Sequence, residues 1–184
     1  CHIASSHLIS DNEDYNFPFL EDEMVELPVA INFCRREQGL IFQKGNPKGI
    51  TADLSNLANN DYGVVIGNPD SGSIGKETKK ILAGYGNFDQ VKERATITLH
   101  SQSLVNAIKA DKADVSINWY AVSTWQENEN YVDGLRIDEA FAKKKKLVLT
   151  VLKDSKNLAQ AKAFLAAAAS EKGHSIFKKF GLAD

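Results

Sequence analysis

The stretch 67–78, GNPDSGSIGKET, contains the residues of this chain that are best suited to binding a ligand. It follows the apolar run 62–66, which we expect to be a buried strand, and precedes 76–84, which we expect to be a helix ending in glycine. The start of a helix offers free backbone N–H groups and the positive end of the helix dipole, and both favour an anion. Glycine and serine are also ordinary in turns that bind nothing, so the loop alone leaves both interpretations open.

Two more predicted strands, 95–99 and 114–120, also end in polar residues. In chain order, the polar residues at the three strand ends are Ser71 and Ser73, Ser101 and Ser103, and Tyr120. Parallel strands joined by right-handed crossovers bring their carboxyl ends to one edge of a sheet, where the ligands of open α/β proteins bind. The sequence therefore predicts that these polar strand ends meet in one site.

The sequence contains no pattern typical of catalytic or metal-binding residues. The stretch 67–76 has glycines and a lysine but not the order G-x-x-x-x-G-K-[ST] of a phosphate-binding loop, and 72–75 lacks the G-x-S-x-G order of a hydrolase nucleophile. The histidines, at positions 2, 7, 100 and 174, do not have the spacing of metal ligands. We therefore expect a protein that is not an enzyme and needs no cofactor and no metal. His100 could contact a ligand from its strand end, although a capping or surface role is more common.

Composition excludes several classes of partner. The 184 residues are 43% hydrophobic and 25% charged, with a formal net charge of -2, so the chain lacks a basic field that would attract nucleic acid. No apolar run reaches the roughly 18 residues of a membrane span, and we expect no membrane insertion. The lysines at 143–146 could bind an anionic partner, but a solvated helix end is the favoured interpretation.

The two cysteines, Cys1 and Cys34, are too few for a disulfide framework or a zinc site. The sequence does not decide whether they form a bridge with each other, and two free thiols, with Cys34 packed in a strand, are favoured. Cys1 could carry a lipid after signal cleavage. The residues behind it have the pattern of a strand, however, so we expect the chain to begin inside a fold.

Apolar runs alternate with amphipathic segments along the chain, which predicts an α/β protein. We expect strands at 29–34, 39–43, 62–66, 95–99, 114–120 and 147–152. We expect helices at 53–58, 76–84, 88–94, 104–111, 158–170 and 171–180, and a further helix that starts near residue 121. Thr51 is the expected cap of the first of these helices.

Several stretches of the chain resemble a known family. The segment 34–50, CRREQGLIFQKGNPKGI, is similar to a periplasmic-binding-like domain related to molybdate-binding proteins, which is sometimes fused to helix-turn-helix regulators. The segments 67–69 with Gly75, 118–120, 151–157 followed by 161–165, and 176–182 resemble molybdate- and tungstate-type solute-binding proteins of ABC importers. The resemblance extends from residue 28 to near the end of the chain.

The resemblance implies a type II periplasmic-binding-protein-like fold, in which two α/β lobes are joined by crossing hinge strands. Residues 1–47 and 147–184 would form lobe 1 with the hinge strands, and 48–146 would form lobe 2. The first strands of lobe 1, with their serine-bearing loops, have no counterpart in this sequence, so the N-terminal part of lobe 1 is expected to be missing. The ligand would lie in the cleft between the lobes.

In the family that the chain resembles, a tetrahedral oxyanion is held without counter-cations by hydroxyls, backbone N–H groups and a tyrosine. The residues of this chain that the resemblance and the polar strand ends assign to ligand binding are Ser71, Ser73, Ile74, Ser101, Gln102 and Tyr120, with Ser5 and Ser6 from the first lobe. A packed aromatic ring is the alternative role for Tyr120. The stretch 72–74 departs from the Val-Pro-Ala-like sequence of molybdate binders, which leaves the identity of the ligand open.

The resemblance implies the ligand-binding component of an ABC importer, with molybdate or tungstate as the type of ligand and the transporter permease as a protein partner. Such a protein would be periplasmic or extracellular, either free or lipid-anchored. The alternative is a cytoplasmic effector-sensing domain of a molybdate-type transcriptional regulator, which the segment 35–40 favours. The C-terminal third favours the transport component. An enzyme that reuses the fold has no support from any residue.

Overall fold

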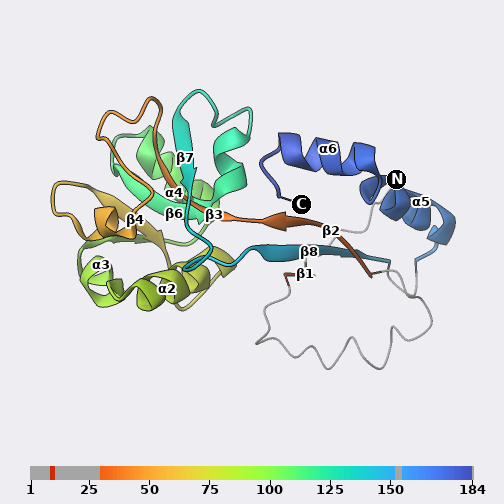
Figure 1. Cartoon of the computed structure of the whole chain (residues 1–184), viewed down its shortest axis with the longest axis horizontal. Coiled ribbons are helices and arrows are strands. Elements are labelled where there is room, and N and C mark those ends of the chain that lie inside the picture. Colours follow the sequence, from red (N-terminus) through yellow and green to blue (C-terminus); the bar gives the residue numbers. More distant parts are fainter. Residues whose placement is uncertain (1–8, 11–29, 152–154, 184) are drawn as a thin grey trace. The chain divides into compact units, whose positions relative to one another are not determined.

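The computed structural model of the chain describes residues 9–10, 30–151 and 155–183 (Figure 1). The chain divides into two compact units, one formed by Cys1–Arg36 with Lys145–Asp184 and the other by Glu37–Lys144. The expected lobes placed residues 37–47 in lobe 1, whereas the strand in this segment pairs within the second unit. The lobe boundaries of the ligand-binding protein stay a prediction.

The second unit is built on a mixed sheet of five strands in the order β5-β4-β6-β3-β7. Its strands are β3 (Gln38–Gln43), β4 (Val64–Gly67), β5 (Thr96–Thr98), β6 (Val115–Trp119) and β7 (Val132–Arg136). Strand β4 is parallel to both β5 and β6, while β3 pairs antiparallel with β6 and β7. Apolar runs predict four of these strands but not β7, because its glycine and charged residues hide the strand pattern.

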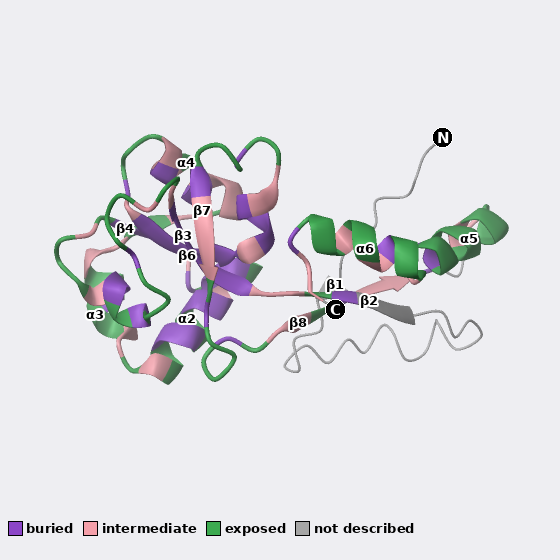
Figure 2. Ribbon diagram, turned by 45° about the horizontal axis from the view of Figure 1, so that its top comes forward, coloured by how far each residue is buried: buried purple, intermediate pink, exposed green. Residues whose placement is uncertain are grey.

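Helices cover both faces of this sheet, with α2 (Ser73–Tyr85) and α3 (Phe88–Arg94) on one side and α4 (Ser101–Lys109) on the other (Figure 1). The core between them is apolar, and residues such as Val65, Ile81, Leu104 and Ile117 are at most 1% exposed (Figure 2). A doubly covered sheet requires strands that are apolar on both faces, and all four residues of β4 are buried. The alternation of strands and helices predicted from the sequence is confirmed.

Two short helices complete the second unit, and one of them corrects a predicted cap. The helix η1 (Leu54–Ala58) is capped by Asp53, whose carboxylate accepts a hydrogen bond of 2.8 Å from the backbone N–H of Ser55. The Thr51 hydroxyl instead accepts from the side chain of Asn56 at 3.0 Å. Because an ionised carboxylate accepts more strongly than a hydroxyl, Asp53 is the better cap. The helix η2 (Tyr120–Thr124) follows β6 directly, as expected.

Glycine sets the geometry of helix α2 at both of its ends. The helix ends at Gly86, which has φ 93 and adopts the left-handed conformation, beyond the expected end at Gly84. At its start, a Cβ on Gly75 would lie 1.8 Å from the carbonyl oxygen of Asn68. The first turn of α2 therefore approaches the loop after β4 so closely that only glycine fits at position 75.

The first unit contains an antiparallel sheet in the order β1-β8-β2, formed by β1 (Ile9–Ser10), β8 (Lys145–Thr150) and β2 (Ala30–Arg36). The helices α5 (Leu158–Ala168) and α6 (Glu171–Lys179) follow β8 in the chain. The lysine run 143–146 is therefore not a helix end, because Lys145 and Lys146 lie in β8.

Cys34 is a free thiol buried against Leu147, as expected, and its burial raises the pKa of the thiol to about 12. Among the described residues, no helix is long and apolar enough to cross a membrane.

Candidate functional site

The carboxyl ends of β4, β5 and β6 lie at one edge of the second unit's sheet because the three strands are parallel. Two hydrogen bonds join neighbouring segments at this edge. The backbone N–H of Asn68, after β4, donates to the carbonyl of Thr98 at 2.8 Å, and the side-chain amide of Asn118 donates to the carbonyl of Ser101 at 2.8 Å. The predicted parallel arrangement is confirmed, and it brings the starts of α2 and α4 to the same edge.

At the start of α2, the backbone N–H groups are not occupied by a side-chain cap and are available as donors. Gly72 is the residue before the helix and has φ 69, and no side chain caps the first turn. Ser71 and Ser73 are exposed, whereas the side chain of Ile74 is 3% exposed and packs in the core. A ligand here would therefore meet the hydroxyls of the two serines and the backbone N–H groups at the start of the helix.

The start of α4 has the same property. His100 precedes the helix, and its side chain does not cap the first turn. Ser101 and Gln102 are half-buried, and the Gln102 side chain donates to Asn106 of its own helix at 3.2 Å. Helix α6, by contrast, has a side-chain cap, because the Ser170 hydroxyl accepts from the backbone N–H of Gly173 at 3.1 Å. Thus the two helices that meet at this edge both begin without a side-chain cap.

Tyr120, the last of the expected site residues along the chain, lies in a narrow space on the sheet. Cβ atoms added at Gly39 and Gly134 would lie 3.2 and 3.3 Å from the ring atom Cδ2 of Tyr120. The guanidinium carbon of Arg136 lies 3.8 Å from the centroid of the ring. The ring is therefore packed, which agrees with the alternative role predicted for Tyr120 from the sequence. Among the described residues its hydroxyl has no hydrogen-bond partner, so it can still donate to a ligand.

A group of balanced charges borders Tyr120. The Glu37 carboxylate accepts from Arg136 Nε at 2.6 Å and lies 3.4 Å from Lys144 Nζ. Lys144 also pairs with Glu139 at 2.6 Å, and the contacts with Glu139 and Glu37 raise the pKa of its ammonium group. Two carboxylates and two cations thus neutralise one another beside the ring.

The structure brings together the expected residues Ser71, Ser73, Ile74, Ser101, Gln102 and Tyr120 at one edge of the sheet, while Ser5 and Ser6 lie outside the described residues. Sequence reasoning missed Thr98, whose hydroxyl is buried and has no hydrogen-bond partner in the described part of the chain. It also missed Arg136. This residue is the last of β7, a strand that the sequence pattern does not predict, so nothing in the sequence indicates that Arg136 lies near Tyr120.

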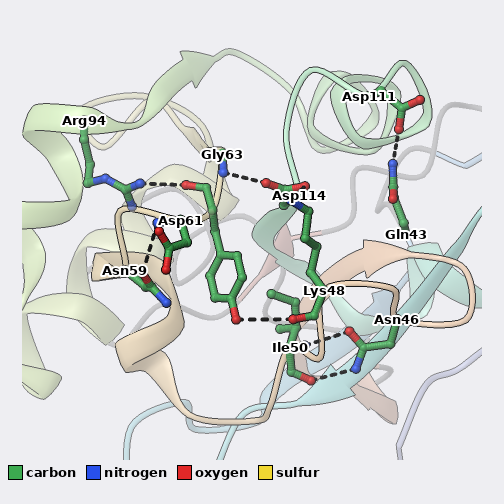
Figure 3. Close-up of polar contacts among 11 residues, drawn as sticks. Gln43, Asn46, Lys48, Ile50, Asn59, Asp61, Gly63, Arg94, Asp111 and Asp114 are labelled. Atoms are coloured by element: carbon green, nitrogen blue, oxygen red, sulfur yellow. Dashed lines mark hydrogen bonds and ion pairs between the residues drawn. The ribbon is translucent and has the colours of Figure 1, made fainter.

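The opposite edge of the same sheet is occupied by structural contacts (Figure 3). There the Asp114 carboxylate accepts from the backbone N–H of Gly63 at 2.7 Å and lies 3.9 Å from Lys48. Arg94 donates to the carbonyl of Tyr62 at 2.6 Å. These polar groups are satisfied by one another and join the loops at the amino ends of the parallel strands. Within the described ranges, no group of three or more His, Cys, Asp or Glu residues could hold a metal ion.

A family model described as bacterial extracellular solute-binding protein matches residues 7–183. The chain belongs to this family. Solute-binding proteins are not enzymes, in agreement with the absence of a catalytic pattern in the sequence. Among curated individual proteins, none matches the chain.

Solved structures of low sequence identity share the fold of this family member. The substrate-binding domain of a putative molybdenum ABC transporter from Clostridium difficile has a TM-score of 0.71 and 20% identity, over 85% of this chain and 66% of that one. The periplasmic molybdate-binding protein of Azotobacter vinelandii has a TM-score of 0.68 and 18% identity, over 90% of this chain and 73% of that one. The sulfate-binding protein SubI from Mycobacterium tuberculosis has a TM-score of 0.63 and 18% identity, over 81% and 56%. The expected type II periplasmic-binding-protein-like fold is confirmed over a partial length.

Proposed function

We propose that this chain is the ligand-binding component of an ABC importer, and that it binds a tetrahedral oxyanion of the molybdate or tungstate kind. The observation that carries the proposal is the meeting of two uncapped helix starts, those of α2 and α4, at the carboxyl edge of three parallel strands. Ligands of open α/β sheets bind at this edge, and uncapped helix starts favour an anion.

The donors available to the anion are neutral. They are the backbone N–H groups at Ser73, Ile74, Ser101 and Gln102, the hydroxyls of Ser71, Ser73 and Ser101, and the hydroxyl of Tyr120. A fixed set of neutral donors stabilises an anion without a counter-cation and selects it by size. Further donors, which we propose include Ser5 and Ser6, would come from the first unit.

Similar proteins support the type of ligand and the setting. Three proteins of similar fold are a putative molybdenum transporter domain, a molybdate-binding protein and a sulfate-binding protein. The chain spans 66% of the length of the first of these, so the function of the whole protein is part of our proposal. The family is extracellular by description, which favours a periplasmic or extracellular protein with a permease partner over a cytoplasmic sensor.

Isothermal titration calorimetry of the full chain with molybdate, tungstate, sulfate and phosphate tests the proposal. We expect saturable heat with at least one of the four anions, and a higher melting temperature in its presence. An anion at 100 times its dissociation constant would raise the free energy of unfolding by about 2.7 kcal/mol. Chloride at the same ionic strength is the control, since a general salt effect would appear with it too. No heat and no thermal shift with any of the four would contradict the oxyanion assignment.

A further inference from the structure

Two glycines make room for the Tyr120 ring on the sheet. Gly39 and Gly134 lie on the neighbouring strands β3 and β7, where Gly39 pairs with Arg136 and Ile41 with Gly134. Because residues that pair across strands, and alternate residues along a strand, share a face, both glycines and Arg136 lie on the same face. A side chain at either glycine would contact the ring at 3.2 or 3.3 Å. The ring thus fills a hollow that the two glycines leave.

Arg136 closes this hollow over the ring. Its guanidinium carbon lies 3.8 Å from the ring centroid, the distance of a stacked cation–π contact. The orientation of the guanidinium is fixed from the side by Glu37, which accepts its Nε–H at 2.6 Å. The Glu37 side chain is only 12% exposed, while the Arg136 side chain is 51% exposed, so water is excluded from the carboxylate more than from the guanidinium.

Glu37 holds Tyr120 through the backbone as well. The carbonyl of Glu37 accepts from the backbone N–H of Tyr120 at 2.9 Å, while its carboxylate binds Arg136 and pairs with Lys144. Glu37 and Lys144 are the first and last residues of the second unit. One residue at the entry of the chain into this unit therefore fixes both the backbone of Tyr120 and the cation above its ring.

We propose that Arg136 is a positioning residue, which holds the Tyr120 ring in the glycine hollow so that its hydroxyl is presented to the anion. Arg136 does not act as a direct cationic ligand, because Glu37 already neutralises its charge. The part of the proposal that concerns affinity rests on the proposed oxyanion function. The part that concerns the ring does not, because the placement of Tyr120 can be measured without ligand.

The first test measures ring placement by NMR of the full chain labelled in its tyrosines, with Tyr120→Phe to identify the signal. We expect Arg136→Ala and Arg136→Lys both to shift the ring signal of Tyr120, since lysine keeps the charge but lacks the planar stack. Lys44→Ala, which breaks the 2.8 Å ion pair to Asp133 in the same sheet, is the matched control and should leave the signal unchanged. An unmoved Tyr120 signal in both Arg136 variants would overturn the proposal.

The second test is a double-mutant cycle for the affinity of the anion that gives heat with the wild-type protein. Arg136→Ala should weaken binding roughly fivefold to twentyfold, the scale of one stacked contact. The double variant with Tyr120→Phe should bind no more weakly than the weaker single variant, because both changes remove one presented hydroxyl. If the losses of affinity in the two single variants multiply in the double variant, Arg136 acts independently of Tyr120, and the positioning role is overturned. Wild-type affinity in Arg136→Lys would show that only the charge of Arg136 matters, and would also overturn the positioning role.

Failure of the proposed oxyanion function and failure of the positioning role of Arg136 can be distinguished. A wild-type protein that gives no heat with any oxyanion contradicts the proposed function, while the NMR measurement still decides whether Arg136 places the ring. Circular dichroism and the melting temperature of each variant show whether the fold is retained. If Arg136→Ala does not fold, Arg136→Lys takes its place in the cycle.

Discussion

At the scale of single residues, the groups that we propose as donors to the anion are neutral. Tyr120 has a packed ring and a hydroxyl without a partner among the described residues. The buried hydroxyl of Thr98, at the end of β5, also lacks a partner in this part of the chain. A buried polar group without a partner is costly in a protein that has no use for it. The buried Thr98 hydroxyl lies at the end of β5, just before the residues that lead into α4, and this position supports a role in binding.

Replacing Tyr120 with phenylalanine tests the hydroxyl alone. The ring of phenylalanine fits the same hollow over Gly39 and Gly134, so we expect the melting temperature to change little. Binding of the oxyanion should weaken by roughly 1–3 kcal/mol, because one hydrogen bond to a charged group is lost. Calorimetry measures the effect, and Tyr131→Phe, at an exposed tyrosine, is the matched control. Unchanged affinity in Tyr120→Phe would remove this hydroxyl from the site.

Gly75 tests how closely α2 must approach the loop after β4. An alanine there would place its Cβ 1.8 Å from the Asn68 carbonyl, and the resulting shift should lower the free energy of unfolding by roughly 1–3 kcal/mol. Gly84 lies in the same helix, and a Cβ added there would have no atom within 4 Å, so Gly84→Ala should stabilise by up to about 1 kcal/mol. Urea unfolding of both variants gives the comparison. If Gly75→Ala and Gly84→Ala change the free energy of unfolding equally, the contact between α2 and the Asn68 carbonyl can adjust without cost.

At the scale of elements, the two helix starts are the features that distinguish this edge of the sheet. Helix η1 and helix α6 are capped by Asp53 and Ser170, whereas α2, α3, α4, α5 and η2 begin without a side-chain cap. A cap would occupy the N–H groups that an anion needs. What sets α2 and α4 apart from the other uncapped α-helices is that they follow the parallel strands β4 and β5, and this position agrees with a ligand at their starts.

A proline at the first position of α2 tests the backbone donors. Ser73 is that position, and proline is well tolerated there because the missing N–H is not needed by the helix. Ser73→Ala removes only the hydroxyl, while Ser73→Pro also removes the N–H, so the difference between their affinities measures the backbone contact. We expect Ser73→Pro to bind roughly tenfold more weakly than Ser73→Ala, the cost of one donor to a charged group. Glu171→Pro, at the first position of α6, is the control and should bind like the wild-type protein.

At the scale of the full chain, family membership and fold agree on a solute-binding protein. The second unit contains a complete sheet covered by helices on both faces, with a continuous apolar core. In the described part of the first unit, Cys34 and Leu147 form a much smaller core, and Phe164 and Ile176 on its helices are about half exposed (Figure 2). All the donors that we assign to the anion, apart from Ser5 and Ser6, therefore belong to the better packed of the two units.

The strands and helices that lead to the proposed site, and the meeting of three strand ends, follow from the amino-acid sequence without further information. Apolar runs and glycine-rich loops are local signals, so they predict β4, β5, β6 and the starts of α2 and α4, and short motifs indicate the family. The prediction that the loop at 67–78 leads into the start of a helix is confirmed on this basis.

The surroundings of Tyr120, by contrast, depend on tertiary structure. Gly39 and Gly134 lie far apart in the chain, and only the pairing of β3 with β7 brings both of them under the ring. No periodicity in the sequence shows that a glycine makes room for the ring of Tyr120 in η2, or that Glu37 neutralises a cation 99 residues away. Pairing of distant strands creates such contacts, and the pattern of either strand alone does not contain them.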